Sequence, residues 1–223
     1  MTMARRYRSE IEKPSFVCAA LSITNIELNP SGQALVDRFE TLYDALRSGT
    51  AGGSEANRLA VRDLLRNGRF RPSGRSKPAQ EYLARVFSQN GRLDLINNAV
   101  DINNYISLRH GLPSSAFDVD KLEGDIVIRL GEPGERYVFN ASGQELDCED
   151  LVVVCDDLGP VGSPVKDSQR TKLFEGATSV LFVVYASDVT TSREALHAIA
   201  EEIGALMTNE CPGAVVEEPV LLG

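Results

Sequence analysis

The most informative stretch of this chain is residues 96–129, INNAVDINNYISLRHGLPSSAFDVDKLEGDIVIR. Its first part predicts a helix over residues 96–109, and its last part predicts a strand over residues 125–130. Asn97, Asp101 and Asn104 are spaced by 4 and 3 residues, so they share one face of the predicted helix. Such a polar stripe either lines a pocket or organises neighbouring loops through hydrogen bonds, and the second role is favoured.

Outward from this stretch, helices and strands alternate without a regular repeat. Helices are predicted over residues 34–46, 55–66 and 79–87, and Thr191 and Glu194 form a capping box that opens a last helix. Strands are predicted over residues 16–28, 136–140, 151–155 and 180–185, and the tail 214–222 is a candidate last strand. This pattern indicates an α+β fold.

The chain has 223 residues, which is enough for one or two domains. The segment 67–78, NGRFRPSGRSKP, is rich in Gly, Pro and Ser and is the best candidate for a boundary. We therefore expect an N-terminal strand and helical portion over residues 1–74 and a second domain over residues 75–223, or one continuous domain. No apolar run is long enough to span a membrane, so a cytoplasmic protein is expected.

The sequence has four cysteines and two histidines, which limits the metal sites and nucleophiles that it can form. Cys18, Cys148, Cys155 and Cys211 form no CxxC pair, which disfavours a zinc site of the usual spacing. No histidine stands near them in the sequence, so none is expected to be a nucleophile. Neither a metal nor a cofactor is expected.

The net charge of −9 argues against non-specific binding of nucleic acid, and no DNA partner is expected. The charge is unevenly distributed, because residues 1–80 carry 13 Lys and Arg against 8 Asp and Glu, a net charge of +5. Residues 81–223 carry 10 against 24, a net charge of −14. A basic front half can contact a phosphate backbone while the acidic remainder limits wrong contacts.

The basic residues of the front half have a helical spacing. Arg58, Arg62, Arg66 and Arg69 are separated by 4, 4 and 3 residues, which places them within one narrow arc of a helix. The loop that follows extends the charge through Arg71, Arg75 and Lys77. We interpret these residues as a ridge that contacts the phosphates of an RNA backbone, with a solvated helix face as the alternative.

The stretch 96–129 also resembles a known family. The shared residues are Val100, Asp101, Asn104, Tyr105, Leu108, Gly111, Pro113, Ala116, Phe117, Asp118, Asp120, Lys121, Leu122, Gly124 and the strand 126–129. They resemble the B3/B4 domain of the β subunit of bacterial phenylalanyl-tRNA synthetase, which hydrolyses wrongly charged tRNA. The resemblance implies layered mixed sheets with helices packed on one side, and an ester hydrolase that acts on the acceptor end of a charged tRNA.

Two further elements resemble freestanding relatives of this editing domain. One is Lys77-Pro78-x-x-Glu81-x-Leu83, and the other is Asp167-Ser168-x-Arg170-Thr171. The resemblance then covers residues 75 to 185. It implies a standalone deacylase that edits mischarged tRNA in trans.

The resemblance also has departures. The synthetase pattern places a histidine of the editing site where this chain has Ser115, and His110 is not taken as its replacement. The glycine-rich loop of the synthetase is shorter here, over residues 159–175. The spacing to Leu173-Phe174-Glu175 still matches, so the resemblance implies that Glu175 corresponds to the pocket glutamate.

We therefore expect Glu175 to recognise the amino acid or its ammonium group, with Ser114 and Ser115 holding the ester and a water molecule. The candidate substrate-binding residues are Asn97, Asp101, Asn104, Asp157, Gly162, Ser163, Asp167 and Arg170. The alternatives are structural: Glu175 as a surface acid, Asp167 as a cap, and Arg170 paired with Asp167 on the surface.

The substrate is less well specified. The resemblance suggests tyrosine on tRNA for phenylalanine, or canavanine on tRNA for arginine, and the acidic residues near 156–167 favour a polar or cationic amino acid. Two other functions fit the same residues: a noncatalytic module that binds tRNA or another RNA, and a binding protein or hydrolase for a small amino-acid derivative.

Overall fold

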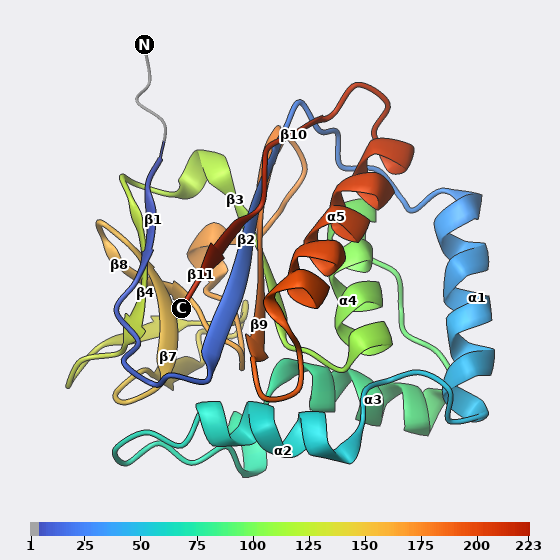
Figure 1. Ribbon diagram of the computed structural model, residues 1–223. Helices are drawn as coiled ribbons and strands as arrows, with labels where there is room; N and C mark the ends of the chain where they lie inside the picture. Colours follow the sequence, from blue (N-terminus) through green and yellow to red (C-terminus); the bar gives the residue numbers. More distant parts are fainter. Residues whose placement is uncertain (1–4) are drawn as a thin grey trace.

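The computed structural model describes residues 5–223, which fold into two stacked sheets and a layer of helices (Figure 1). The first sheet has the strand order β1-β4-β7-β8, and the second has the order β10-β2-β9-β3, with β11 also paired to β2. The strands of these sheets are β1 (Tyr7–Ser9), β2 (Phe16–Thr24), β3 (Ser114–Asp118), β4 (Ile126–Leu130), β7 (Val152–Asp156), β8 (Gly159–Gly162), β9 (Ser179–Ser187), β10 (Val215–Val216) and β11 (Val220–Leu222).

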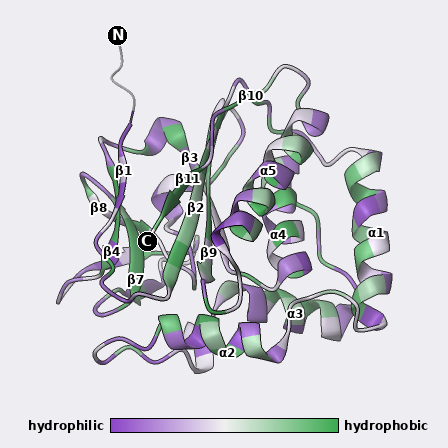
Figure 2. Cartoon of the chain, in the orientation of Figure 1, coloured by the Kyte–Doolittle hydropathy of each residue, from purple (hydrophilic) through white to green (hydrophobic). Residues whose placement is uncertain are grey.

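The second sheet is buried on both faces because it lies between the first sheet and the helices. Its two long strands, β2 and β9, pair over nine residues each. Successive side chains of a strand point to opposite faces. Phe182 and Val184 therefore enter the core under the helices, whereas Leu181 and Val183 enter the core between the sheets. Figure 2 accordingly shows these strands as largely hydrophobic.

The helices cover one side of the second sheet. α4 (Asn98–His110) and α5 (Arg193–Glu210) pack on the sheet, α1 (Gln33–Arg47) lies outside α4, and α2 (Glu55–Leu64) and α3 (Ala79–Asn90) run across the end of the layers (Figure 1). β5 (Arg136–Val138) and β6 (Glu145–Asp147) form a small separate hairpin in the connection between β4 and β7 of the first sheet. The expected α+β fold, with layered sheets and helices on one side, is confirmed.

The segment before residue 75 takes part in both cores. β2 is an inner strand of the second sheet, Leu35 and Phe39 of α1 belong to the core under the helices, and Leu64 of α2 belongs to the core between the sheets. The boundary expected near residue 75 therefore does not separate two independent cores.

Several element boundaries differ from the sequence predictions. α2 ends at Leu64, short of the expected residue 66, and α5 is capped by Ser192, whose side chain accepts from the Ala195 amide. The sequence analysis did not predict β3, which carries Ser114 and Ser115. Among residues 5–223, no helix combines the length and apolarity needed to cross a bilayer.

Candidate functional site

A polar cluster lies between the two sheets, where β3 at the edge of one sheet meets the loop that follows β8 at the edge of the other. Ser115 Oγ donates to Asp167 Oδ1 at 2.7 Å and lies 3.1 Å from the Tyr185 hydroxyl. Because the only proton of Ser115 is donated to Asp167, Tyr185 must donate to Ser115. The result is a hydrogen-bond chain from Tyr185 through Ser115 to the carboxylate of Asp167.

A second tyrosine holds the loop that carries Asp167. The Tyr137 hydroxyl lies 2.9 Å from Ser163 Oγ and 2.5 Å from the Lys166 carbonyl oxygen. Ser163 Oγ in turn accepts from the amides of Val165 and Lys166. Ser163, which the sequence analysis offered as a substrate ligand, thus has its hydrogen-bonding capacity used within the loop.

Gly162 permits the close approach of this loop to the sheet. A Cβ atom at position 162 would lie 2.5 Å from Asp167 Oδ1 and 2.5 Å from the Phe117 ring. Any larger residue would therefore push Asp167 away from Ser115. The predicted site residue Gly162 is next to the cluster, and its role there is to leave space.

Asp167 is the ionisable member of the cluster. Burial raises the pKa of its carboxyl to about 7, although hydrogen bonds from Ser115 and from the backbone of Ala116 and Ser163, and the charge of Lys172, act in the opposite direction. The residue as a whole keeps some exposure, whereas Ser115 and Tyr185 are each 1% exposed. The cluster therefore meets solvent through Asp167, with a carboxyl that changes its charge near neutral pH.

Ser114 and Ser115 face opposite sides of β3. Ser114 Oγ donates to Asn103 Oδ1 of α4 at 2.6 Å, on the helix side of the sheet, whereas Ser115 faces the first sheet. The two serines, which were expected to hold one ester together, thus have different neighbours on opposite faces of the strand.

Glu175 is not brought into this cluster. It is exposed, in the turn before β9, and so lies beyond the Ser179 end of that strand. Ser115 instead pairs with Val183, four residues further along β9. The structure thus separates the two residues that the sequence analysis placed in one pocket.

The polar stripe of α4 organises loops. Asn97 caps the helix and accepts from the Val100 amide at 2.9 Å, and Asp101 accepts from Ser31 Oγ at 2.6 Å and from the Ile96 amide at 2.8 Å. Burial raises the pKa of Asp101. Asn104 is half-buried on the same helix. These contacts fit the structural role that the sequence analysis favoured for the stripe.

Arg170 pairs with Asp156, not with Asp167. Its two terminal nitrogens lie 2.9 and 2.8 Å from the carboxylate oxygens of Asp156. Burial opposes the charge of Asp156, yet the hydrogen bonds from Arg170 and from the Glu123 amide outweigh it and lower the pKa. Asp156 is therefore not free to bind a cationic substrate, and Asp157 lies at the exposed tip of the β7–β8 turn.

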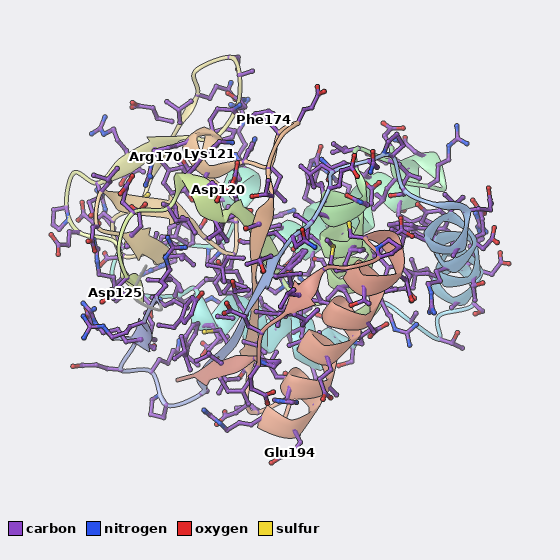
Figure 3. All side chains as sticks on the ribbon, turned by 90° about the horizontal axis from the view of Figure 1, so that it is seen from above. Asp120, Lys121, Asp125, Arg170, Phe174 and Glu194 are labelled. Atoms are coloured by element: carbon purple, nitrogen blue, oxygen red, sulfur yellow. The ribbon has the colours of Figure 1, made fainter. Side chains whose placement is uncertain are left out.

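Figure 3 shows where this ion pair lies in the molecule. Arg170, Lys121 and Asp120 are grouped on one side, remote from Glu194 at the start of α5, and Arg170 also donates to the Lys121 carbonyl at 3.1 Å. Phe174 projects beyond this group, with Lys121 Nζ 5.0 Å from its ring centre. Arg170 thus ties the loop after β8 to the segment after β3.

The basic ridge expected along residues 58–69 is not a single helical face. Arg58 is paired with Glu55, and Arg62 forms a bidentate pair with Glu81 of α3, with both distances 2.6 Å. Arg66 and Arg69 lie beyond the end of α2. Neighbouring acids therefore neutralise the first half of the ridge.

The second half of the basic segment borders an open groove of about 910 Å³. Arg69, Arg71 and Arg75 form one side, residues 144–149 form the opposite side, and Lys166 and Phe139 also line it. Lys166 directly precedes Asp167 in the chain, but its side chain lines the groove whereas Asp167 faces Ser115. Arg66 and Lys77 are exposed outside this lining.

Sequence reasoning missed Tyr137, Tyr185, Lys166 and Phe139. Tyr185 stood within an apolar strand prediction, and only the register of β3 on β9 places it beside Ser115. A further residue, Gln80 of α3, is 5% exposed, and its side-chain amide has no hydrogen-bond partner among residues 5–223. The Ala79 amide next to it donates to the Pro164 carbonyl, so Gln80 adjoins the loop that carries Asp167.

The cysteines do not contribute a nucleophile. All four are buried, and burial raises the pKa of Cys18, Cys148 and Cys155, the last two to about 12. Thiols with raised pKa values are poor nucleophiles. In the part of the chain that the structure describes, no three His, Cys, Asp or Glu side chains gather in an arrangement suited to a metal ion.

Comparison with known proteins gives a consistent match. The model of the B3/4 domain family matches residues 70–206. The phenylalanine–tRNA ligase β subunit of Aquifex aeolicus is 38% identical over 92 residues, which are 37% of this chain and 12% of that subunit. The β subunit of Nocardia farcinica is 41% identical over 88 residues, which are 39% of this chain and 10% of that subunit. The chain thus matches about a tenth of the length of these relatives.

One solved structure aligns with most of the length of the chain. It is an N-terminal fragment of the phenylalanyl-tRNA synthetase β subunit from Pyrococcus horikoshii. The alignment covers 98% of this chain and 50% of that fragment, with a TM-score of 0.46 and 12% sequence identity.

Proposed function

The chain belongs to the B3/4 domain family, and from this premise we propose that it is a deacylase that hydrolyses the ester of a mischarged aminoacyl-tRNA in trans. The resemblance to the synthetase editing domain supports the reaction. The Asp167-Ser168-x-Arg170-Thr171 element, which resembles freestanding relatives, supports action in trans.

The observation that carries the proposal is the hydrogen-bonded pair of Ser115 and Asp167, in a loop that also contributes Lys166 to an open groove. An aminoacyl ester is already activated, so its hydrolysis needs a bound water molecule, a base and a site that orients the substrate. Asp167 is suited to act as such a base, because Ser115 fixes its orientation and the residue keeps some exposure to solvent. A pKa near 7 suits a general base that works at neutral pH.

In this proposal the water oxygen forms a bond to the ester carbonyl carbon while its proton passes to the carboxylate of Asp167. The bond between that carbon and the ribose oxygen then breaks, and the ribose oxygen takes up the proton. Ser115 and Tyr185 act as positioning residues, since both are buried and neither reaches solvent. The products are a free amino acid and an uncharged tRNA.

The candidate substrates remain tyrosine on tRNA for phenylalanine and canavanine on tRNA for arginine. A cationic amino acid would find Asp167 as its nearest carboxylate, because Asp156 is paired with Arg170. We propose Glu175 as at most a peripheral contact of the substrate, since its turn lies away from the cluster.

The test is the loss of radiolabelled amino acid from a panel of charged tRNAs that includes correct pairs and both mischarged candidates. We expect one mischarged tRNA to be deacylated rapidly, and Asp167→Asn to slow that reaction by at least about 100-fold. Asp94→Asn, which changes an exposed acid, is the matched control. Stability of every charged tRNA would overturn the proposal, and retained binding of tRNA would then favour the noncatalytic RNA-binding module.

A further inference from the structure

The groove between the basic loop and the β5–β6 hairpin is lined by both cations and anions. Each of its acidic side chains forms an ion pair with an arginine. Arg69 lies 2.8 Å from Asp147 and 2.6 Å from Glu149. Glu145 has its own partner, Arg136, at 3.4 Å. The three acids that line the groove are therefore all engaged by arginines.

Three cations in the groove, Arg71, Arg75 and Lys166, have no anionic partner within residues 5–223. Of these, Arg71 donates to the backbone carbonyls of Gly68 and Phe70 at 2.8 and 2.7 Å. Arg75 and Lys166 come from segments ninety residues apart, the short helix Gly74–Ser76 and the loop after β8. The fold thus brings these two uncompensated positive charges to one groove.

Lys166 is also held in place. Its Nζ lies 3.7 Å from the centre of the Phe139 ring, and the side chain is half-buried. Partial burial and the positive charge of Arg75 both lower its pKa, which shows that the two cations act on each other. A desolvated cation beside a like charge is unfavourable unless an anion binds between them.

We propose that Lys166 and Arg75 bind a backbone phosphate of a single-stranded RNA 3′ end that lies in the groove. The volume of about 910 Å³ is within the range of roughly 300–1,000 Å³ that holds small ligands, so the groove has room for a few nucleotides. A basic groove combined with an aromatic side chain is a usual means of binding single strands. The proposal rests on the proposed function only in naming RNA as the source of the phosphate.

The location supports this assignment. Lys166 and Asp167 are adjacent in the chain, and their loop is fixed by the hydrogen bond from Tyr137 to the Lys166 carbonyl. Lys166 faces the groove and Asp167 faces Ser115, so this one loop supplies a cation to the groove and a carboxylate to the cluster. The same loop would then position both the nucleic acid and the reacting ester.

The test measures binding and not hydrolysis. A fluorescent RNA minihelix with a single-stranded CCA end is titrated with the full-length protein at several salt concentrations. We expect Lys166→Gln and Arg75→Gln each to weaken binding roughly tenfold and to reduce the slope of log K against log salt by about 0.7. Lys166→Arg keeps the charge and should restore most of the affinity. Arg38→Gln on α1, far from the groove, is the control for loss of one charge.

The competitors identify the source of the phosphate. A minihelix without the single-stranded end should bind weakly and should not respond to Lys166→Gln. If inorganic phosphate or free AMP competes as well as the CCA-ended RNA, the groove is a site for small phosphates and the RNA assignment is wrong. Unchanged RNA affinity and slope in both variants, with both proteins folded, would overturn the proposal.

These outcomes are separable from those of the proposed function. Deacylation that does not depend on Lys166 or Arg75 would contradict the proposed phosphate site and would still support the proposed deacylase. RNA binding that depends on both residues, without deacylation of any charged tRNA, would support the phosphate site and contradict the proposed deacylase.

Discussion

At the scale of single residues, Asp167 determines how the protein should respond to pH. Its carboxyl is hydrogen-bonded to Ser115 and to the backbone of Ala116 and Ser163, and burial raises its pKa to about 7. In the unfolded chain the pKa of an aspartate is about 3.9. Ionising this side chain therefore costs more in the folded protein than in the unfolded chain.

The first prediction follows from this shift. Between about pH 4 and pH 7 the folded protein binds a proton at Asp167 that the unfolded chain does not, so this residue's contribution to stability decreases as pH rises. Asp167→Asn cannot ionise and should become progressively more stable than the parent protein from pH 5 to pH 8. Urea denaturation at both pH values measures the difference, and a constant difference would contradict the raised pKa.

The pH dependence of catalysis has the opposite sign. A general base acts in its ionised form, so deacylation should increase as pH rises through about 7 and then level off. The measurement is the single-turnover rate from pH 5.5 to 8.5. A rate independent of pH over this range would exclude Asp167 as the base.

Glu175 provides a contrast to Asp167. Because it lies in an exposed turn outside the cluster, we expect Glu175→Ala to retain most of the deacylation activity. The match in motif spacing predicts the reverse, complete loss. Parallel rates of Glu175→Ala and Asp167→Asn decide between the two assignments, provided that both variants show the thermal stability of a folded protein.

Gln80 is an internal polar group whose side-chain amide has no partner in the described part of the chain. Burying such a group costs roughly 1–3 kcal/mol. Gln80→Met has a similar volume and no amide, so we expect the free energy of unfolding to increase by about 1 kcal/mol. Gln89→Met, on the exposed part of the same helix, should leave stability nearly unchanged. Destabilisation by Gln80→Met would mean that the amide does have a partner.

At the scale of elements, one ion pair joins α2 to α3. Arg62 and Glu81 are bound through two hydrogen bonds, and the Glu81 side chain is 12% exposed. Breaking a partly buried bidentate pair leaves a charge without its partner. Glu81→Gln should therefore lower the free energy of unfolding by roughly 1–3 kcal/mol. Glu55→Gln, which disrupts an exposed pair with Arg58, is the matched control and should have little effect.

The elements also show what can be predicted from the sequence. The helix containing Leu35, Phe39 and Leu42 was predicted to within one residue of α1, because apolar side chains recur at the helical period and all three are buried. β3 was missed because its sequence, SSAFD, has weak strand propensity. Pairing with β9 makes it a strand, and that pairing is a tertiary effect.

The same reason explains the parts of the site that were missed. Ser115 was identified from its position in a motif, but its partners Asp167 and Tyr185 come from segments 52 and 70 residues away. Their distances depend on strand register and on the loop after β8, which local spacing does not specify. Motifs therefore located Ser115 and Asp167 separately, and the fold brought them together and added Tyr185.

At the scale of the whole molecule, the uneven charge of the chain is largely neutralised within the fold. Basic residues of the first half pair with acids of the second, as Arg62 does with Glu81 and Arg69 with Asp147 and Glu149. In the groove, Arg75 and Lys166 keep their positive charges without an ion pair in the described part of the chain, on a protein with a net charge of −9. RNA binding should accordingly be confined to one groove and should weaken steeply with salt.

The central claim is that Asp167 hydrolyses the ester of a mischarged tRNA. The most direct measurement is the single-turnover deacylation of the charged tRNA panel by the parent protein, Asp167→Asn and the control Asp94→Asn. We predict rapid loss of one mischarged species, a loss of rate of at least about 100-fold in Asp167→Asn, and an unchanged rate in the control. Equal rates in all three proteins, or no hydrolysis by the parent, would contradict the claim.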